Sequence, residues 1–175
     1  MKAMIVYDSV YGNTEQIAQA IGGALGNPED VTIIKASAFN PDQLAGVSLL
    51  IIGSPTQRFN STLPVTNLLK GISRHALKGM KVTAFDTRLT QSNIEETPAL
   101  AFFVRLWGQA AYAAKPLADK LRKKGGVLIA PPEGFYVEGM KGPLVQGELE
   151  RAANWAKQIA SDSGQPTFRS LPPLR

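Results

Sequence analysis

The chain of 175 residues contains no cysteine and a single histidine, His75. The lack of cysteine excludes a disulfide scaffold, a thiol nucleophile, a thiolate zinc site and a cysteine-ligated iron–sulfur cluster. One histidine argues against a multi-histidine metal site and against a Ser–His–Asp triad. Neither a catalytic side chain nor a metal site is predicted, so any redox chemistry has to come from a bound cofactor.

Long apolar runs are also missing. No uninterrupted apolar segment of the sequence is long enough to cross a bilayer as a helix. The apolar run in residues 1–8 is too short for a signal-peptide core and precedes no small-residue cleavage site. The sequence therefore predicts a cytoplasmic protein without a membrane span.

Positive charge exceeds negative charge, with 19 lysines and arginines against 14 acidic residues. The basic residues are scattered except for one cluster without interleaved aromatics: Lys120, Arg122, Lys123 and Lys124. Cations at the end of a helix complement its dipole, which explains this cluster without nucleic acid. We expect no nucleic-acid partner, and a basic surface favours partner proteins with acidic surfaces.

Short apolar segments alternate with amphipathic segments along the chain. Strands are expected at residues 2–7, 31–34, 47–52, 81–85 and 127–130, the last resuming at 135–137, and helices at about 14–25, 62–72, 97–124 with a break near Gly108, and 147–160. This alternation predicts one α/β domain, a doubly wound parallel sheet with helices on both faces, over residues 1–160. Residues 161–175 contain three prolines and are expected to form a loosely ordered tail.

Ligands of such sheets bind beyond the carboxyl ends of the strands, which directs attention to three loops. The first loop joins a strand to a helix and reads Ser9, Val10, Tyr11, Gly12, Asn13 and Thr14. A phosphate there would meet unpaired N–H groups, two hydroxyls and a glycine that permits close approach. Asn13 and Gln16 have the spacing of a capping box, so a helix cap without a ligand remains the alternative.

The first loop resembles the FMN-phosphate loop of the flavodoxin family, usually Ser/Thr-x-Thr-Gly-x-Thr, from which Tyr11 departs. Gly142-Pro143-Leu144 and the following Gly147-Glu148 resemble the closing segment of that family, so the similarity extends over residues 2–160. The resemblance implies a flavodoxin-like, five-stranded sheet of order 2-1-3-4-5 in three α/β/α layers. It also implies FMN as cofactor and electron transfer with redox partner proteins.

The resemblance further implies that the second loop flanks the isoalloxazine ring with Pro55, Thr56, Gln57, Arg58, Phe59 and Asn60. Phe59 is then the expected stacking ring and Arg58 a cationic lid, whereas Phe59 packing in the core is the alternative.

The third loop, after the fourth strand, contains Asp86, Thr87 and Arg88, and it lacks the tyrosine that electron-carrying family members usually place there. The second flavin face is then covered by Arg88, by an aromatic of the following segment, or by nothing. Those aromatics are Phe102, Phe103, Trp107 and Tyr112, and their helical spacing favours the protein core. Asp86 is expected to be a hydrogen-bonding scaffold group.

Three functions remain open at this stage: an FMN-binding electron-transfer protein, an FMN-dependent NAD(P)H:quinone-type oxidoreductase, and an FMN-free interaction module of the same fold. The oligomeric state is not determined by the sequence.

Overall fold

Within residues 1–96 and 98–163, which the computed structural model describes, six strands form one parallel sheet. The strands are β1 (Ala3–Tyr7), β2 (Val31–Lys35), β3 (Leu49–Pro55), β4 (Lys81–Leu89), β5 (Val127–Leu128) and β6 (Glu133–Val137). Their order is β2-β1-β3-β4-β5, and β6 pairs with the second half of β4. The predicted doubly wound sheet of order 2-1-3-4-5 is confirmed.

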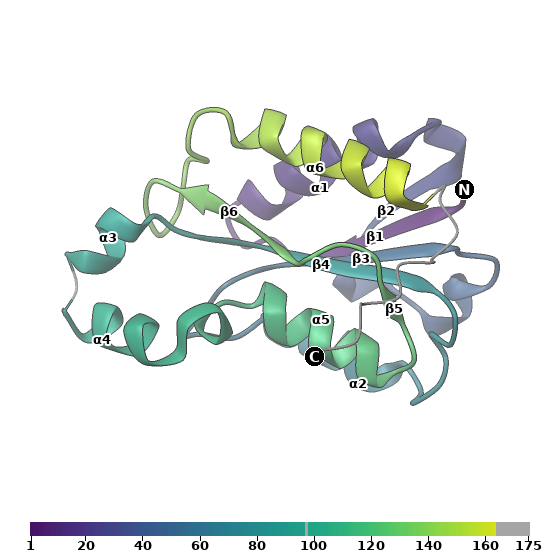
Figure 1. Cartoon of the computed structure of the whole chain (residues 1–175), viewed down its shortest axis with the longest axis horizontal. Coiled ribbons are helices and arrows are strands. Elements are labelled where there is room, and N and C mark those ends of the chain that lie inside the picture. The colour runs from purple at the N-terminus through teal and green to yellow at the C-terminus, as the bar shows by residue number, and fades with distance from the viewer. Residues whose placement is uncertain (97, 164–175) are drawn as a thin grey trace, which may run out of the picture.

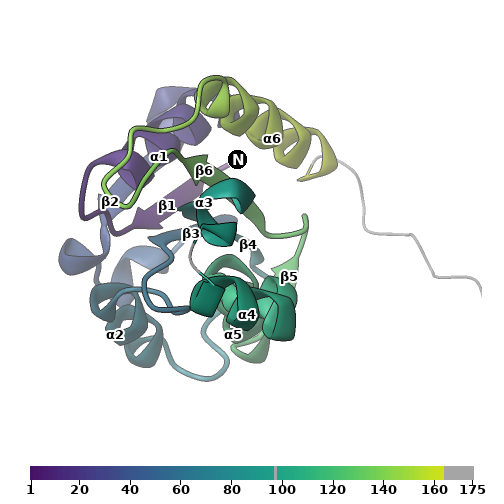
Figure 2. The ribbon, with the colours of Figure 1, turned by 90° about the vertical axis from the view of Figure 1, so that its left-hand side faces the viewer.

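Helices cover both faces of the sheet and thereby form the three layers (Figures 1 and 2). The helices are α1 (Asn13–Leu25), α2 (Leu63–Gly71), α3 (Gln91–Glu95), α4 (Pro98–Trp107), α5 (Ala114–Lys123) and α6 (Glu148–Ser163). Short 3-10 helices span Pro28–Asp30, Ala36–Ala38, Pro41–Leu44 and Gly108–Ala111. In Figure 1, α1 and α6 lie on one face, α2 and α5 lie on the other, and α3 and α4 extend past the carboxyl ends of the strands.

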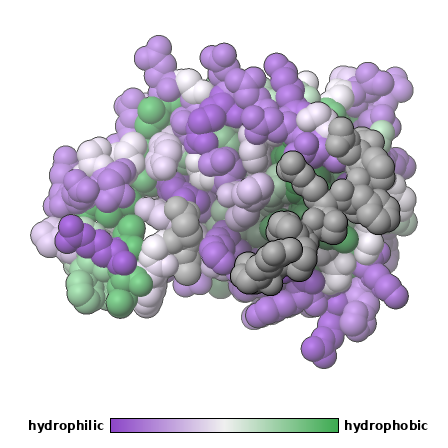
Figure 3. All heavy atoms as spheres, viewed as in Figure 1, coloured by the Kyte–Doolittle hydropathy of each residue, from purple (hydrophilic) through white to green (hydrophobic). Residues whose placement is uncertain are grey.

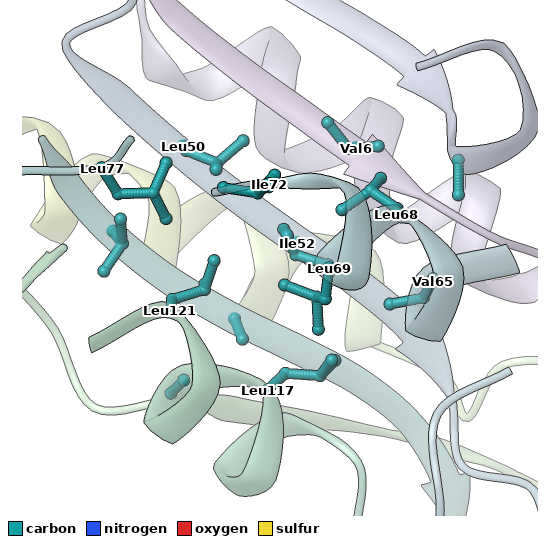
Figure 4. Packing of buried hydrophobic residues seen from close by; sticks show 14 of the residues in the cluster. Val6, Leu50, Ile52, Val65, Leu68, Leu69, Ile72, Leu77, Leu117 and Leu121 are labelled. Carbon is teal, nitrogen blue, oxygen red and sulfur yellow. The ribbon is translucent and has the colours of Figure 1, made fainter. Parts of the chain in front are cut away.

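The central strands are buried on both sides, which is why their sequences read as continuous apolar runs. Every residue of β1 is buried, as are the first six residues of β3. Because successive side chains point to opposite faces, Ile5 and Ile51 pack toward α1 and α6, while Val6 and Ile52 pack toward α2 and α5. Figure 4 shows the second cluster, where Leu68 and Leu69 of α2 meet Leu117 and Leu121 of α5.

The fifth strand position is divided between two short strands. β5 pairs with the start of β4 through Lys81↔Val127, and β6 pairs with its end from Phe85↔Glu133 to Leu89↔Val137. Pro131 and Pro132 lie between the two strands, and proline has no N–H to donate to a sheet ladder. The predicted interruption at residues 131–134 is therefore wrong at both ends, because β5 already ends at Leu128 and β6 already begins at Glu133.

Two helix ends test expectations from the sequence. The last turn of α5 contains Lys120, Arg122 and Lys123, which supports the dipole interpretation of the basic cluster. The last helix does not end at residue 160 but continues to Ser163, so residues 161–163 are helical rather than part of a loose tail. The rest of the expected tail, residues 164–175, lies outside the described part of the chain.

Candidate functional site

A cavity of about 1010 Å³ opens at the carboxyl ends of β1, β3 and β4. It is lined by the following residues expected from the three loops: Ser9, Val10, Tyr11, Asn13, Thr14, Pro55, Thr56, Gln57, Arg58, Phe59, Thr87 and Arg88. The other three expected residues, Gly12, Asn60 and Asp86, are not among the lining residues. The volume is at the upper end of the roughly 300–1,000 Å³ of small-molecule pockets.

The loop between β1 and α1 lines this cavity and contains unpaired backbone N–H groups. Gly12 precedes α1 in the left-handed conformation, with φ 86°, and open space surrounds its Cα. Among the described residues, the N–H groups of Tyr11 to Thr14 have no hydrogen-bond partner. They lie at the positive end of the helix dipole, equivalent to roughly half an elementary charge. The loop therefore offers unpaired donors that suit an anion, and it contains no lysine or arginine.

The expected capping box at this loop is wrong. Gly12, not Asn13, is the N-cap, and it has no side chain that could form a capping hydrogen bond. The Asn13 amide instead donates to the carbonyl of Lys141 at 3.1 Å. A Cβ on Gly142 would overlap this amide, so a glycine is needed where the closing segment crosses the loop.

Two hydroxyls complete the loop. The Ser9 Oγ accepts a hydrogen bond from the Glu15 N–H at 3.3 Å, which leaves the hydroxyl proton of Ser9 free to donate. The Thr14 Oγ1 lies 2.9 Å from the Thr87 Oγ1, and both threonines are buried. This contact ties the end of β4 to the first turn of α1, so two of the three expected loops meet at one wall of the cavity.

The loop after β3 folds into a tight two-residue turn. Gln57 and Asn60 exchange two backbone hydrogen bonds of 2.9 Å around Arg58 and Phe59, which have φ values of 47° and 65°. Such a turn normally contains Asn-Gly, because left-handed backbone costs other residues about 1–2 kcal/mol each. Strain of this kind is retained mainly at functional sites.

The turn determines where the Phe59 ring lies. The ring lines the cavity and contacts Phe103 and Trp107 of α4, with centroid distances of 5.5 and 5.6 Å. Phe59 is half-buried, and it belongs to neither of the two core clusters. The alternative that Phe59 packs in the protein core is therefore wrong, and its role as a stacking ring remains a prediction.

The residues expected to form the third loop belong to the end of strand β4. β4 continues to Leu89, four residues beyond the predicted end, so Asp86, Thr87 and Arg88 are paired in the sheet. Alternation within the strand places Asp86 and Arg88 on the same side, where the guanidinium donates to both carboxylate oxygens at 2.6 and 2.8 Å. Asp86 is fully buried and Arg88 is only 8 % exposed. Arg88 is thus a paired cation rather than a free lid over a ligand.

Asp86 also organises the wall of the cavity opposite the first loop. Its Oδ2 accepts the Ala114 N–H at 2.7 Å at the start of α5, and the neighbouring Ala113 N–H donates to the Thr56 hydroxyl at 2.9 Å. Burial raises the pKa of the Asp86 carboxyl, while the Arg88 guanidinium and the Ala114 N–H act in the opposite direction. The expectation that Asp86 is a scaffold group agrees with these contacts.

The Arg88 guanidinium lies against two neighbours that the sequence did not indicate. Its central carbon is 3.9 Å from the centre of the Tyr112 ring, a cation–π contact, and Tyr112 lines the cavity. On β6, a Cβ at Gly134 would overlap the same guanidinium. The glycine therefore provides the space in which Arg88 can pair with Asp86.

The cavity has thirteen further lining residues, of which the sequence named only Phe103 and Tyr112, as possible covers of the second flavin face. They are Leu89, Asn93, Ile94, Glu96, Ala99, Phe103, Val104, Ala111, Tyr112, Val137, Glu138, Gly139 and Met140. The Asn93 amide donates to the Glu138 carbonyl, so α3 is attached to the loop after β6. The interpretation of the aromatics in this segment as core residues is wrong for Phe102, Phe103 and Trp107, which are exposed, and Tyr112 is half-buried.

The ion pair makes a prediction about pH. In Arg88→Leu, Asp86 stays buried without its cation, so its folded-state pKa rises above the value of about 3.9 in the unfolded chain. Stability is then lost as pH rises through the folded-state pKa, because the unfolded state releases the proton more easily. We expect the deficit in unfolding free energy relative to the wild type to be larger at pH 7 than at pH 5, as measured by urea denaturation.

The double variant Asp86→Asn/Arg88→Leu is the control for this experiment, because it has no titrating group at position 86. Its deficit in unfolding free energy relative to the wild type should be nearly the same at pH 7 and pH 5. A pH-independent deficit in the single variant would contradict the assignment.

The donor set of the cavity can be matched to a ligand. Neutral N–H and hydroxyl donors at a helix N-terminus suit a phosphate monoester, and the half-buried rings of Phe59 and Tyr112 suit a flat aromatic group. Within the described ranges, no three histidine, cysteine, aspartate or glutamate side chains form a group that could hold a metal ion. None of the helices in these ranges is both long enough and apolar enough to span a bilayer.

Comparisons with known proteins bear on the fold and the family of the chain. No curated protein sequence matches the chain. Similar solved structures include a flavodoxin from the domain Archaea (21 % identity, 94 % of this chain and 100 % of that chain, TM-score 0.66) and Flavodoxin 2 from Bacillus cereus (20 %, 92 % and 99 %, 0.70). Rubredoxin oxygen:oxidoreductase from Desulfovibrio gigas is similar over 93 % of this chain and 36 % of that chain, with 19 % identity and a TM-score of 0.68.

Because these sequence identities are low, the solved structures show only the fold of the chain. The family is shown by a match to the sequence. The family described as a flavodoxin domain matches residues 4–128, which is more than half of the chain. The amide-lined loop before α1 and the aromatic wall of the same cavity lie within or next to this match. The chain therefore belongs to the flavodoxin domain family, and its cofactor is FMN.

Proposed function

We propose that this protein carries electrons between redox partner proteins by means of bound FMN. The observation that carries the proposal is the single cavity that joins an uncharged anion site, the N–H groups of Tyr11 to Thr14, to the ring-lined wall of Phe59 and Tyr112. FMN supplies the one- and two-electron chemistry when bound, and the protein supplies position and electrostatic environment. Location in the cytoplasm remains a prediction from the sequence.

Different residues of the cavity would hold the phosphate and the ring of FMN. The N–H groups of residues 11–14 and the hydroxyls of Ser9 and Thr14 would hold the phosphate. Thr56, Gln57 and Phe59 would flank the ring from the loop after β3. The bidentate Asp86–Arg88 pair leaves Asp86 positioned to accept the Ala114 N–H at the start of α5, and the neighbouring Ala113 N–H donates to the Thr56 hydroxyl. These contacts hold in place the loop after β3, which would contact the ring.

A second candidate function is an FMN-dependent reductase that takes hydride from NAD(P)H. The size of the cavity favours it, because about 1010 Å³ leaves room for an acceptor beside a flavin. Apolar lining residues such as Phe103 and Met140 would suit such an acceptor.

The absorbance spectrum of the purified protein, before and after incubation with FMN, tests these functions. Flavin bands that remain after desalting support the carrier and the reductase, and a protein that retains no flavin would contradict both functions. Bleaching by NADPH without a helper reductase identifies the reductase. Bleaching only when a reductase or another reduced carrier is added supports the proposed carrier.

Removing a hydroxyl from the anion loop is expected to weaken FMN binding while the fold is kept. A hydrogen bond to a charged group contributes about 1.5–3 kcal/mol, so Ser9→Ala and Thr14→Ala should each lower the affinity about tenfold or more. Quenching of flavin fluorescence measures the affinity. Thr14→Ser, which keeps the hydroxyl, should restore most of the loss.

Thr66→Ala is the matched control for this experiment. Thr66 forms a similar hydroxyl pair with Ser61 at 3.2 Å, and it does not line the cavity. Its FMN affinity should equal that of the wild type. Unchanged affinity in both Ser9→Ala and Thr14→Ala would mean that the phosphate binds elsewhere.

A further inference from the structure

Helix α4 presents an apolar surface that the described chain does not cover. Its exposed large apolar side chains are Phe102 (62 % exposed), Phe103 (38 %), Leu106 (64 %) and Trp107 (48 %). No side chain of α4 that the structure describes is buried, although surface helices normally bury their apolar face. Figure 3 shows apolar residues gathered at the end of the molecule where α4 lies in Figure 1. Exposed apolar patches of this kind mark interaction sites.

The rings at this surface hold one another in place. We use the name aromatic platform for Phe59, Phe102, Phe103 and Trp107. Phe103 contacts each of the other three rings, with centroid distances of 5.5 Å to Phe59, 5.7 Å to Phe102 and 5.5 Å to Trp107. Rings that are already ordered lose little conformational entropy when a partner binds, and aromatic side chains are enriched where proteins bind one another tightly.

The aromatic platform is continuous with the cofactor cavity. Phe59 and Phe103 belong to the platform and also line the cavity. A protein seated on the platform would therefore lie against the mouth of the flavin site. This is the position that electron exchange requires, because its rate falls steeply with distance between donor and acceptor.

Positive charge flanks the platform. Arg58 precedes Phe59 in the tight turn, and Arg105 lies within α4, and both side chains are exposed. Neither α4 nor residues 57–60 contain an acidic residue. The neighbouring acids are Glu95 and Glu96, before the start of α4, and Glu138, which lines the cavity. The chain as a whole has a net charge of +5. An acidic surface is the complement of this arrangement.

We propose that the aromatic platform, with Arg58 and Arg105 beside it, is the docking site for an acidic electron-carrier protein. The proposal rests on the proposed function as a carrier and names the partner by its chemistry. A second copy of this chain fits less well, because a twofold interface through α4 would bring Arg58 and Arg105 close to their own counterparts. An anionic membrane fits less well too, because lipid-binding patches typically cluster about 4–8 basic residues.

A plant-type [2Fe–2S] ferredoxin, an acidic one-electron carrier, is a suitable probe. In a stopped-flow experiment, one electron passes from the reduced ferredoxin to the FMN-loaded protein, so the cluster is oxidised and the flavin is reduced. The second-order rate constant should fall steeply as salt is raised. Arg105→Glu and Trp107→Ala should each lower the rate constant at low salt, Arg105→Glu by about tenfold or more.

Arg122→Glu is the matched control, because it makes the same change of charge on α5, where Arg122 is exposed and 3.8 Å from Asp119. It should change the rate constant less than twofold. Arg105 does not line the cavity, so Arg105→Glu should keep the flavin affinity of the wild type. Trp107 packs against Phe59, so Trp107→Ala is compared with the wild type at saturating FMN. Calorimetric binding of oxidised ferredoxin to the protein, with or without FMN, should show the same order of effects.

The outcomes separate the docking site from the cofactor site. Equal effects of Arg105→Glu and Arg122→Glu would overturn the proposal, since net charge alone would then act. A dimer that Trp107→Ala dissociates in sedimentation, or binding to phosphatidylserine vesicles that Trp107→Ala abolishes, would overturn it in favour of a second copy or a membrane. If the protein retains no FMN but ferredoxin still binds at the platform, the docking site stands and the proposed carrier function fails.

Discussion

Replacing Asp86 by alanine is expected to lower the free energy of unfolding by about 3–5 kcal/mol. The substitution leaves the Arg88 guanidinium, now only 8 % exposed, without the carboxylate to which it donates at 2.6 and 2.8 Å. Breaking a buried pair by removing one partner costs much more than removing the pair, because the remaining charge has left water without compensation. Denaturation with urea at pH 7 measures the change.

The same substitution should also disturb the cavity. The Asp86 carboxylate accepts the Ala114 N–H at the start of α5, and this turn positions Ala113 against the Thr56 hydroxyl. A loop that contacts the ring of FMN would lose its support, so FMN affinity should fall even in the fraction of the protein that is folded. Asp86→Asn, which keeps the size of the side chain, should lose less stability than Asp86→Ala.

Asp119→Ala is the matched control, because Asp119 forms ion pairs with Lys115 at 3.3 Å and Arg122 at 3.8 Å on the exposed face of α5. Exposed pairs contribute about 0–1 kcal/mol, so this variant should remain close to the wild type. A similar loss of unfolding free energy in Asp86→Ala and Asp119→Ala would contradict the claim that burial makes the Asp86–Arg88 pair costly to break.

Riboflavin is expected to bind at least about 100-fold more weakly than FMN. The two ligands share the same ring system, so their difference isolates the phosphate in the loop between β1 and α1. Two hydrogen bonds to a charged group, at about 1.5–3 kcal/mol each, correspond to a 100-fold change or more. The unpaired N–H groups of Tyr11 to Thr14 provide more than two such donors. Fluorescence titration with each ligand gives the ratio.

Competition by inorganic phosphate provides a second measurement of the same site. Phosphate should lower the apparent affinity for FMN, but it should have little effect on riboflavin, and chloride at the same ionic strength should do neither. Similar affinities for FMN and riboflavin would show that the loop caps a helix and holds no phosphate, which was the alternative interpretation of its sequence.

Local sequence was sufficient for the architecture and for the anion loop. Continuous apolar strands that alternate with amphipathic helices permit few arrangements other than a parallel sheet covered on both faces. The loop of residues 9–14 could be recognised because its chemistry is contained within one strand–helix junction. A glycine with φ 86° and the free N–H groups at a helix start depend on neighbours in the chain, not on distant contacts.

The end of β4 could not be predicted from its own residues. Asp86, Thr87 and Arg88 are polar, so they resemble a loop, yet they are strand residues because β3 and β6 pair with them on either side. The carboxylate and guanidinium can be buried there because they pair with each other, and Gly134 provides the necessary space.

Sequence by itself determined the alternation of strands and helices and excluded thiol chemistry, and its resemblance to a family indicated the order of the sheet and the loop predicted to hold a phosphate. Only the tertiary structure decided that the apolar side chains of α4 lie at the surface beside the cavity, and that Arg88 is paired rather than free. The physical reason is that helical periodicity shows which residues share a face, whereas the packing of distant segments decides whether anything covers that face.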